Sequence, residues 1–133
     1  MTVRAKNNAI VAAVAIGMAV LAVTLLPMIA SSELDRGRDV HLVIRDMAFY
    51  VDGDGTPNPT LTFKAGERVR VFVRNEDAGM NHDFVVKDWK IKSRTIHGRG
   101  ETHLTIKMPR RASTASYYCT PHAGKMRGTI SVE

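Results

Sequence analysis

The sequence predicts an all-β fold, a β-sandwich that follows one apolar helix at the N-terminus. Short runs in which apolar and polar residues alternate recur from residue 40 to the C-terminus, as in half-buried strands. Glycine, proline and aspartate separate these runs, and no run beyond residue 30 has a convincing helical period. The exception is residues 9–30, a continuous apolar segment without a charge. Six to eight short strands at this spacing favour a sandwich.

The N-terminal segment has the length of a membrane span. Residues 1–8 are short and basic, and the 22 residues 9–30 suit a bilayer better than the shorter core of a signal peptide. We expect a single-pass anchor in the cell membrane, with Arg4 and Lys6 in the cytoplasm and the rest on the periplasmic, extracytoplasmic side. The alternative is a signal segment that is cleaved near residue 30, which would release the chain to the periplasm. Met28 is a poor match to the small residue that such a site prefers.

Composition indicates one exported domain. We expect residues 1–32 to hold the anchor or signal segment with the start of a tether, and residues 33–133 to form one domain with a modest core. The net charge is +6, and without the basic residues of the leader the seventeen basic and thirteen acidic residues leave +4. This surplus favours an acidic partner or an anionic membrane. No basic cluster with interleaved aromatics indicates nucleic acid, and a single cysteine excludes an internal disulfide.

The domain reads as a series of strands and turns. Val69, Val71 and Val73 are expected to face inward between outward arginines, and the same alternation marks the other strands. The stretches 49–59 and 75–81 are expected to be loops, residues 100–101 a turn, and residues 87–99 a weakly patterned basic region. The expected strands cover residues 40–45, 61–63, 68–74, 82–86, 102–108, 115–119 and 128–132.

One stretch near the C-terminus carries the chemistry. Residues 117–128 read Tyr-Tyr-Cys-Thr-Pro-His-Ala-Gly-Lys-Met-Arg-Gly and contain the only cysteine, Cys119. His122 follows three residues later and Met126 four beyond that. Thiolate, imidazole and thioether are donors that suit copper, and a blue-copper site needs a second imidazole. His82, within Gly-Met-Asn-His-Asp-Phe at residues 79–84, offers one.

These two segments resemble the copper-binding segments of the cupredoxins, the family of plastocyanin, pseudoazurin, amicyanin and azurin. The resemblance covers roughly residues 39–133 and implies a Greek-key sandwich with one type 1 copper ion. It implies that His82, Cys119 and His122 bind copper in a plane, with Met126 as a weak axial ligand. It also implies a protein that transfers single electrons and is not an enzyme, because four protein ligands leave no position for a substrate.

Two departures from the family pattern concern the surroundings of the metal. The spacing between His122 and Met126 is one residue shorter than in plastocyanin and one longer than in amicyanin, so the alternative is that Met126 packs in the core. Asp83 stands where relatives have asparagine after the first histidine, in the segment that begins with Asn81. We expect Asp83 to accept a hydrogen bond from the Thr120 hydroxyl, and as a carboxylate to favour Cu(II) and lower the reduction potential.

The resemblance leaves several functions open. The leading hypothesis is a membrane-tethered electron carrier between redox partners such as a cytochrome, an oxidase, a reductase or another membrane complex, with electrons passing through His122. Lys125 and Arg127 are candidates for guiding an acidic partner to that face. The alternatives are a copper-handling protein and an accessory subunit of a larger respiratory or photosynthetic complex. The remaining histidines are expected to lie at the surface: His41, His97 and His103.

Overall fold

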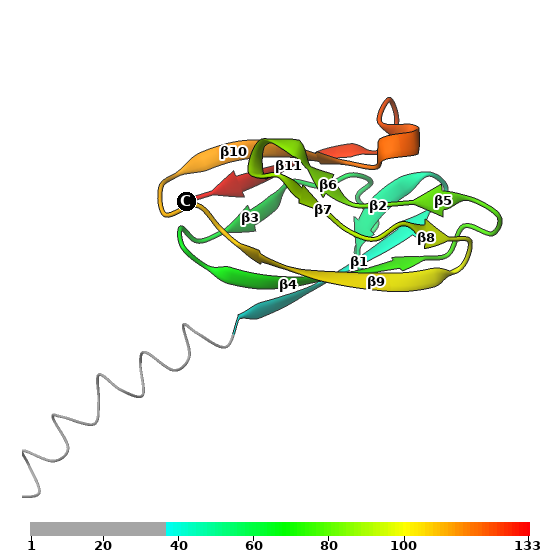
Figure 1. Ribbon diagram of the computed structural model, residues 1–133, viewed down its shortest axis with the longest axis horizontal. Coiled ribbons are helices and arrows are strands. Elements are labelled where there is room, and N and C mark those ends of the chain that lie inside the picture. The colour runs from blue at the N-terminus through cyan, green and yellow to red at the C-terminus, as the bar shows by residue number, and fades with distance from the viewer. Residues whose placement is uncertain (1–36) are drawn as a thin grey trace, which may run out of the picture. The chain divides into compact units, whose positions relative to one another are not determined.

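Two β-sheets face each other in the computed structural model, which describes residues 37–133 (Figure 1). The predicted N-terminal helix and the boundary near residue 32 lie outside the described residues. Among residues 37–133, no helix combines the length and the apolar character that crossing a membrane requires.

The elements are short and close together in the chain. The strands are β1 (Arg38–Arg45), β2 (Ala48–Val51), β3 (Leu61–Phe63), β4 (Arg68–Asn75), β5 (Asn81–His82), β6 (Val85–Val86), β7 (Ile91–Lys92), β8 (Ile96–His97), β9 (Gly100–Lys107), β10 (Ser113–Tyr118) and β11 (Arg127–Val132). Two single-turn 3-10 helices interrupt them, η1 (Lys87–Trp89) and η2 (Thr120–His122). Strands therefore dominate the described part of the chain, as the alternating pattern predicted.

The sheets have the order β2-β1-β4-β9 and β3-β11-β10-β6-β7, and β5 pairs with β8 as a separate two-stranded ribbon. Neighbours are mostly antiparallel, but β1 runs parallel to β4 and β3 runs parallel to β11. Parallel neighbours need a crossover connection, and here the chain crosses from one sheet to the other between them. The predicted Greek-key β-sandwich is confirmed.

The core lies between the two sheets. Val69, Val71 and Val73 of β4 are fully buried, as predicted, and the arginines that alternate with them are exposed. The second sheet contributes Tyr117 of β10 and Ile130 of β11, each at most 1% exposed. Alternate residues of a strand lie on opposite faces, so this burial follows directly from the period-two pattern.

Two predicted loops are partly wrong. Residues 49–51 belong to β2, because a two-residue turn at Asp46 and Met47 folds them back along β1, where Phe49 is completely buried. The expected turn at residues 100–101 is the start of β9, since β4 is long enough to pair Asn75 with Gly100. In both places a neighbouring strand, β1 or β4, extends the sheet over residues whose local sequence is typical of a turn.

The fold brings two distant segments to one end of the sandwich. The connection from β10 through η2 to β11 lies at the same end as the β5–β8 ribbon in Figure 1, and β5 contacts η2. This end therefore combines the segments that carry the predicted copper ligands.

Candidate metal centre

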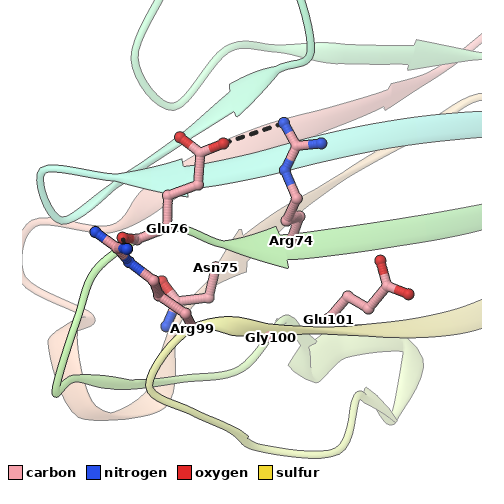
Figure 2. Close-up of a pocket in the computed structure, with 6 residues that line it drawn as sticks. All are labelled: Arg74, Asn75, Glu76, Arg99, Gly100 and Glu101. Atoms are coloured by element: carbon pink, nitrogen blue, oxygen red, sulfur yellow. Dashed lines mark hydrogen bonds and ion pairs between the residues drawn. The ribbon is translucent and has the colours of Figure 1, made fainter.

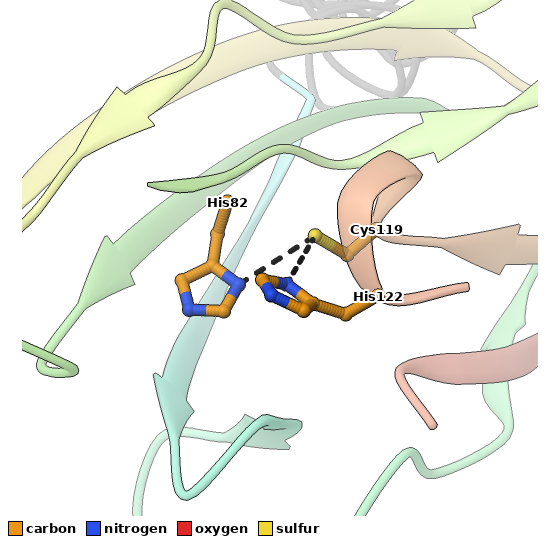
Figure 3. Close-up of side chains that lie close together, drawn as sticks. All are labelled: His82, Cys119 and His122. Atoms are coloured by element: carbon orange, nitrogen blue, oxygen red, sulfur yellow. Dashed lines mark hydrogen bonds between the residues drawn. The ribbon is translucent and has the colours of Figure 1, made fainter. Parts of the chain in front are cut away.

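Three donor atoms meet where β5 approaches η2. His82 ends β5, Cys119 directly follows β10, and His122 ends η2. The Cys119 Sγ atom lies 3.5 Å from Nδ1 of His82 and 3.6 Å from Nδ1 of His122. Figure 3 shows both rings turned toward the sulfur. All three donors lie within 4.8 Å of one another, so one ion can contact them together.

The spacing of these atoms fits a transition metal. Metal bonds of about 2.0 Å to nitrogen and 2.3 Å to sulfur, at a tetrahedral angle, separate the two donors by about 3.5 Å. The separations of 3.5 and 3.6 Å agree with that value. A thiolate with two imidazoles is the equatorial donor set of a blue-copper site. The residues present therefore fit copper.

Burial sets the protonation of two of these donors. Burial and the neighbouring His122 lower the pKa of His82, against the opposing effects of Asp77 and Asp83. His82 is thus held in the neutral form that binds metals. Burial also raises the pKa of the Cys119 thiol, and the backbone N–H of Asp83 only partly offsets this effect. A metal must therefore displace the thiol proton as it binds.

The loop between Cys119 and Met126 is closed by its own backbone. The N–H of Cys119 donates to the carbonyl of Met126 at 3.1 Å, and the N–H of Met126 donates to the carbonyl of His122 at 2.9 Å. Pro121 fixes a backbone angle at the start of η2. Met126 is fully buried beside these residues. Together with His82, the loop residues Cys119, His122 and Met126 form a type 1 copper-like site. The backbone hydrogen bonds that close the loop limit its rearrangement.

Asp83 ties this loop to the first histidine segment. Its Oδ1 atom accepts a hydrogen bond of 2.6 Å from the backbone N–H of Thr120, rather than from the hydroxyl that we expected. The other oxygen, Oδ2, lies 3.3 Å from the Nζ atom of Lys92. Asp83 is 2% exposed, so its charge is held next to both ligand segments. The sequence placed Lys92 of β7 only within a basic region, and its pairing with Asp83 as a compensating cation was not predicted.

Other candidates lie away from the donors. Asn81 is exposed, and its Oδ1 atom contacts Nδ1 of His97 at 3.1 Å instead of the ligand loop. His41 and His103 are exposed on the outer face of the first sheet, on either side of Phe72. The three non-ligand histidines are thus at the surface, as predicted. Met80, beside the first ligand segment, is 38% exposed.

The sequence reasoning missed Asn75 and Asp77, which lie in a stretch expected only to be a loop. Asn75 is 2% exposed, and its Nδ2 atom donates to the carbonyls of Met80 and Gly98. The Asp77 carboxylate contacts His82 from the side opposite to Cys119. Asparagine and aspartate before a ligand histidine were the available signal, but polar residues in such a stretch are ordinary turn formers.

A surface pocket at the ends of β4 and β9 contains none of the predicted ligands. Its volume is about 600 Å³. Figure 2 shows Arg74 paired with Glu76 there, across 3.1 Å. The full lining is Arg74, Asn75, Glu76, Arg99, Gly100 and Glu101. Since this lining has no histidine, cysteine or methionine, the pocket lacks the donor types that suit copper.

Comparisons with known proteins agree with this geometry. Residues 57–133 match the family described as copper binding proteins, plastocyanin/azurin family. A search of curated protein sequences gives no match. Auracyanin A, a "blue" copper protein from the green thermophilic photosynthetic bacterium Chloroflexus aurantiacus, has a similar structure, with a TM-score of 0.59, 18% identity, and coverage of 73% of this chain and 99% of that one.

Two further solved structures have the same fold. Reduced auracyanin from the photosynthetic bacterium Roseiflexus castenholzii has a TM-score of 0.58 at 15% identity, and the match covers 73% of this chain and 98% of that one. A reduced amicyanin variant has a TM-score of 0.51 at 23% identity, with 77% and 88% covered.

Proposed function

Because this chain belongs to the copper-binding plastocyanin/azurin family, we propose that it is a single-electron carrier with one type 1 copper ion. The observation that carries the proposal is the set of donor atoms from His82, Cys119 and His122, which lie within 4.8 Å of one another. Cys119 and His122 belong to a loop closed by backbone hydrogen bonds. Bound copper would supply the one-electron chemistry by alternating between Cu(II) and Cu(I). His82, Cys119, His122 and Met126 are the residues that would hold the ion.

The chain's own contribution is rigidity. His82 is fixed at a strand end, and the carboxylate of Asp83 joins its segment to Thr120 in the ligand loop. A site that is already arranged changes little when its charge changes, so electron transfer meets a small reorganisation barrier. Four protein donors also leave no position for a substrate, which supports a carrier over an enzyme.

His122 is the proposed point of electron entry and exit. Among the three clustered donors it alone is partly exposed, whereas His82 and Cys119 are fully buried. Lys125 in the same loop and Arg127 at the start of β11 are exposed cations. They support docking of an acidic face of a redox protein, such as a cytochrome, an oxidase or a reductase, near His122.

The proposal includes a membrane anchor at the N-terminus. The uncharged residues 9–30, behind a basic N-terminus, support a single-pass membrane anchor with the copper domain on the periplasmic side. Fractionation of cells that express the full chain separates this arrangement from a released periplasmic protein. A copper-handling role has less support, because three of the four predicted ligands, His82, Cys119 and Met126, are fully buried instead of forming an exposed methionine and histidine cluster.

Spectroscopy of the full-length chain loaded with Cu(II) tests the proposed function. We expect an intense thiolate-to-copper band in the visible range and a narrow copper hyperfine splitting in electron paramagnetic resonance. Both follow from a short, covalent bond between copper and the Cys119 sulfur. A colourless protein with an ordinary copper signal would mean that Cys119 is not a ligand, and the electron-carrier proposal would fail.

We expect Asp83→Asn to raise the reduction potential. The buried carboxylate favours the more highly charged Cu(II), and the amide removes that charge while keeping an acceptor for the Thr120 N–H. Since Lys92 already compensates part of the charge, the change should be about tenfold in the ratio of Cu(II) to Cu(I) affinity, or about 59 mV. Protein-film voltammetry measures it.

Lys92→Met is the matched comparison for this prediction. It leaves the carboxylate of Asp83 without its cation, so the potential should fall. An unchanged or lower potential in Asp83→Asn would contradict the assigned effect of Asp83.

A further inference from the structure

His82 has two ring nitrogens in different surroundings. Nδ1 faces the sulfur of Cys119 at 3.5 Å. Nε2, on the other side of the fully buried ring, makes no hydrogen bond with any described residue. The carboxylate of Asp77 contacts it, with Oδ2 3.4 Å from Nε2. A buried N–H without an acceptor costs about 1–3 kcal/mol, so Nε2 requires a partner.

We propose that Asp77 is a positioning residue of the copper site, whose carboxylate accepts a hydrogen bond from Nε2–H of His82 and thereby keeps Nδ1 free for the metal. The inference rests on the proposed copper function. A neutral imidazole carries its proton on one nitrogen only, and the acceptor at that nitrogen selects the tautomer. A histidine that binds a metal generally donates its other N–H to a carboxylate, a carbonyl or a water, which also fixes the ring orientation.

The carboxylate of Asp77 is itself held in place. Its Oδ1 atom accepts from the backbone N–H of Asp46 at 2.8 Å, and Oδ2 accepts from that of Met47 at 3.1 Å. The N–H of Asp77 donates to Oδ1 of Asn75 at 3.0 Å. Asn75 is buried and bonded to the carbonyl of Gly98. Asp77 therefore stands at a fixed position beside His82, as a group that orients a ligand must.

The same contacts give Asp77 a second role, stabilisation of the β1–β2 turn, which the test must separate from its effect on His82. Asp46 and Met47 have φ values of 51° and 57°, so both central residues of the β1–β2 turn are left-handed. Such type I′ turns normally use Asn-Gly, because other residues are strained there. Asp77 stabilises this turn by accepting both N–H groups. Loss of Asp77 would thus disturb the hairpin as well as His82.

A turn-optimised background removes this ambiguity. The double substitution Asp46→Asn with Met47→Gly supplies the residues that a type I′ turn prefers, so the hairpin no longer depends on the carboxylate. Asp77→Asn is then introduced into the full-length chain in both the natural and this background. The amide has one acceptor oxygen for three N–H donors, those of Asp46, Met47 and His82.

The matched control is Glu76→Gln. It removes one negative charge at the adjacent position, but this side chain pairs with Arg74 in the pocket of Figure 2, whose lining does not include His82. Asp77→Asn and Glu76→Gln therefore change the net charge equally and differ in the contact with the ligand.

The first readout uses metal-free protein, in which ¹⁵N nuclear magnetic resonance reports the tautomer of His82. We expect the Nε2–H form in the natural chain and in Glu76→Gln, and a larger Nδ1–H population in both Asp77→Asn proteins. The second readout is Cu(II) affinity by chelator competition. It should fall about 10–100-fold in both Asp77→Asn proteins, as for other groups that orient a metal ligand.

Two results would overturn the proposal. One is an Asp77→Asn protein whose His82 tautomer and Cu(II) affinity match those of Glu76→Gln. The other is a change that disappears in the turn-optimised background, since Asp77 would then act only on the hairpin. The tautomer measurement needs no copper, so it decides the role of Asp77 even if the natural chain lacks a type 1 spectrum and the proposed function fails.

Discussion

Cys119→Ser is expected to abolish the intense visible band of the copper-loaded chain and to reduce Cu(II) affinity by more than about 100-fold. Groups that merely orient a ligand cost about 10–100-fold when lost, and Cys119 is the central donor. Its sulfur lies 3.5 Å from Nδ1 of His82 and 3.6 Å from Nδ1 of His122, between the two clustered histidines. A serine hydroxyl lacks the soft thiolate that makes this donor set suitable for copper. Visible absorption and chelator competition measure the two effects.

Met126→Leu is the control for this substitution. Leucine and methionine have similar volumes, so the fully buried position stays filled while the thioether proposed as a ligand is lost. The visible band should remain in Met126→Leu, with a shifted position and an altered reduction potential. A buried serine hydroxyl without a hydrogen-bond partner lowers the stability of the fold by about 1–3 kcal/mol. Thermal unfolding of the metal-free proteins therefore checks that Cys119→Ser is still folded. An intense band that survives Cys119→Ser would refute the assignment of the sulfur.

Gly128→Ala is expected to destabilise the protein by about 2–4 kcal/mol. Gly128 on β11 pairs with Tyr117 on β10, and a Cβ atom at residue 128 would collide with the Tyr117 ring and hydroxyl. The ring has no room to move, because it is fully buried, stacks on Phe84 and meets Phe49 edge to face. Its hydroxyl also donates to the carbonyl of Pro59 at 2.7 Å. Overpacking costs about 1–3 kcal/mol, and the weakened hydrogen bond adds about 1 kcal/mol.

Differential scanning calorimetry of the metal-free chain measures this effect. For a domain of this size, the predicted loss lowers the melting temperature by roughly 10–25 °C. Gly55→Ala is the matched control, since a Cβ atom there meets nothing within 4 Å and the residue has no positive φ. Its stability should change by less than about 0.5 kcal/mol. If Gly128→Ala and Gly55→Ala have the same melting temperature, the prediction that Tyr117 leaves no room for a Cβ atom at residue 128 is contradicted.

The strand pattern was predictable because it depends on local alternation. Val69, Val71 and Val73 lie in the core where the period of two placed them, since a pleated strand must direct alternate side chains to opposite faces. The limits of β2 and β9 were not predictable in the same way. Residues 49–51 and 100–101 become strands because β1 and β4 lie beside them, and such pairing depends on residues distant in the chain.

The metal loop was predictable for a related reason. Cys119, His122 and Met126 fall within eight consecutive residues, so their spacing limits how far apart they can lie, and their chemistry indicates copper. His82 was found because the donor set needed a second imidazole and the family pattern offered that position. Its distance to Cys119, 37 residues away in the chain, comes from the folded structure.

The sequence by itself therefore determined the fold class, the copper-binding family and the chemical identity of the donors. Only the tertiary structure decided which groups surround them: Asp77 at the far side of His82, Lys92 beside Asp83, and Gly128 beneath the ring of Tyr117. The physical reason is that donor chemistry and strand alternation are properties of neighbouring residues. Charge compensation, tautomer selection and ring packing depend on strands that become neighbours only when the sheets form.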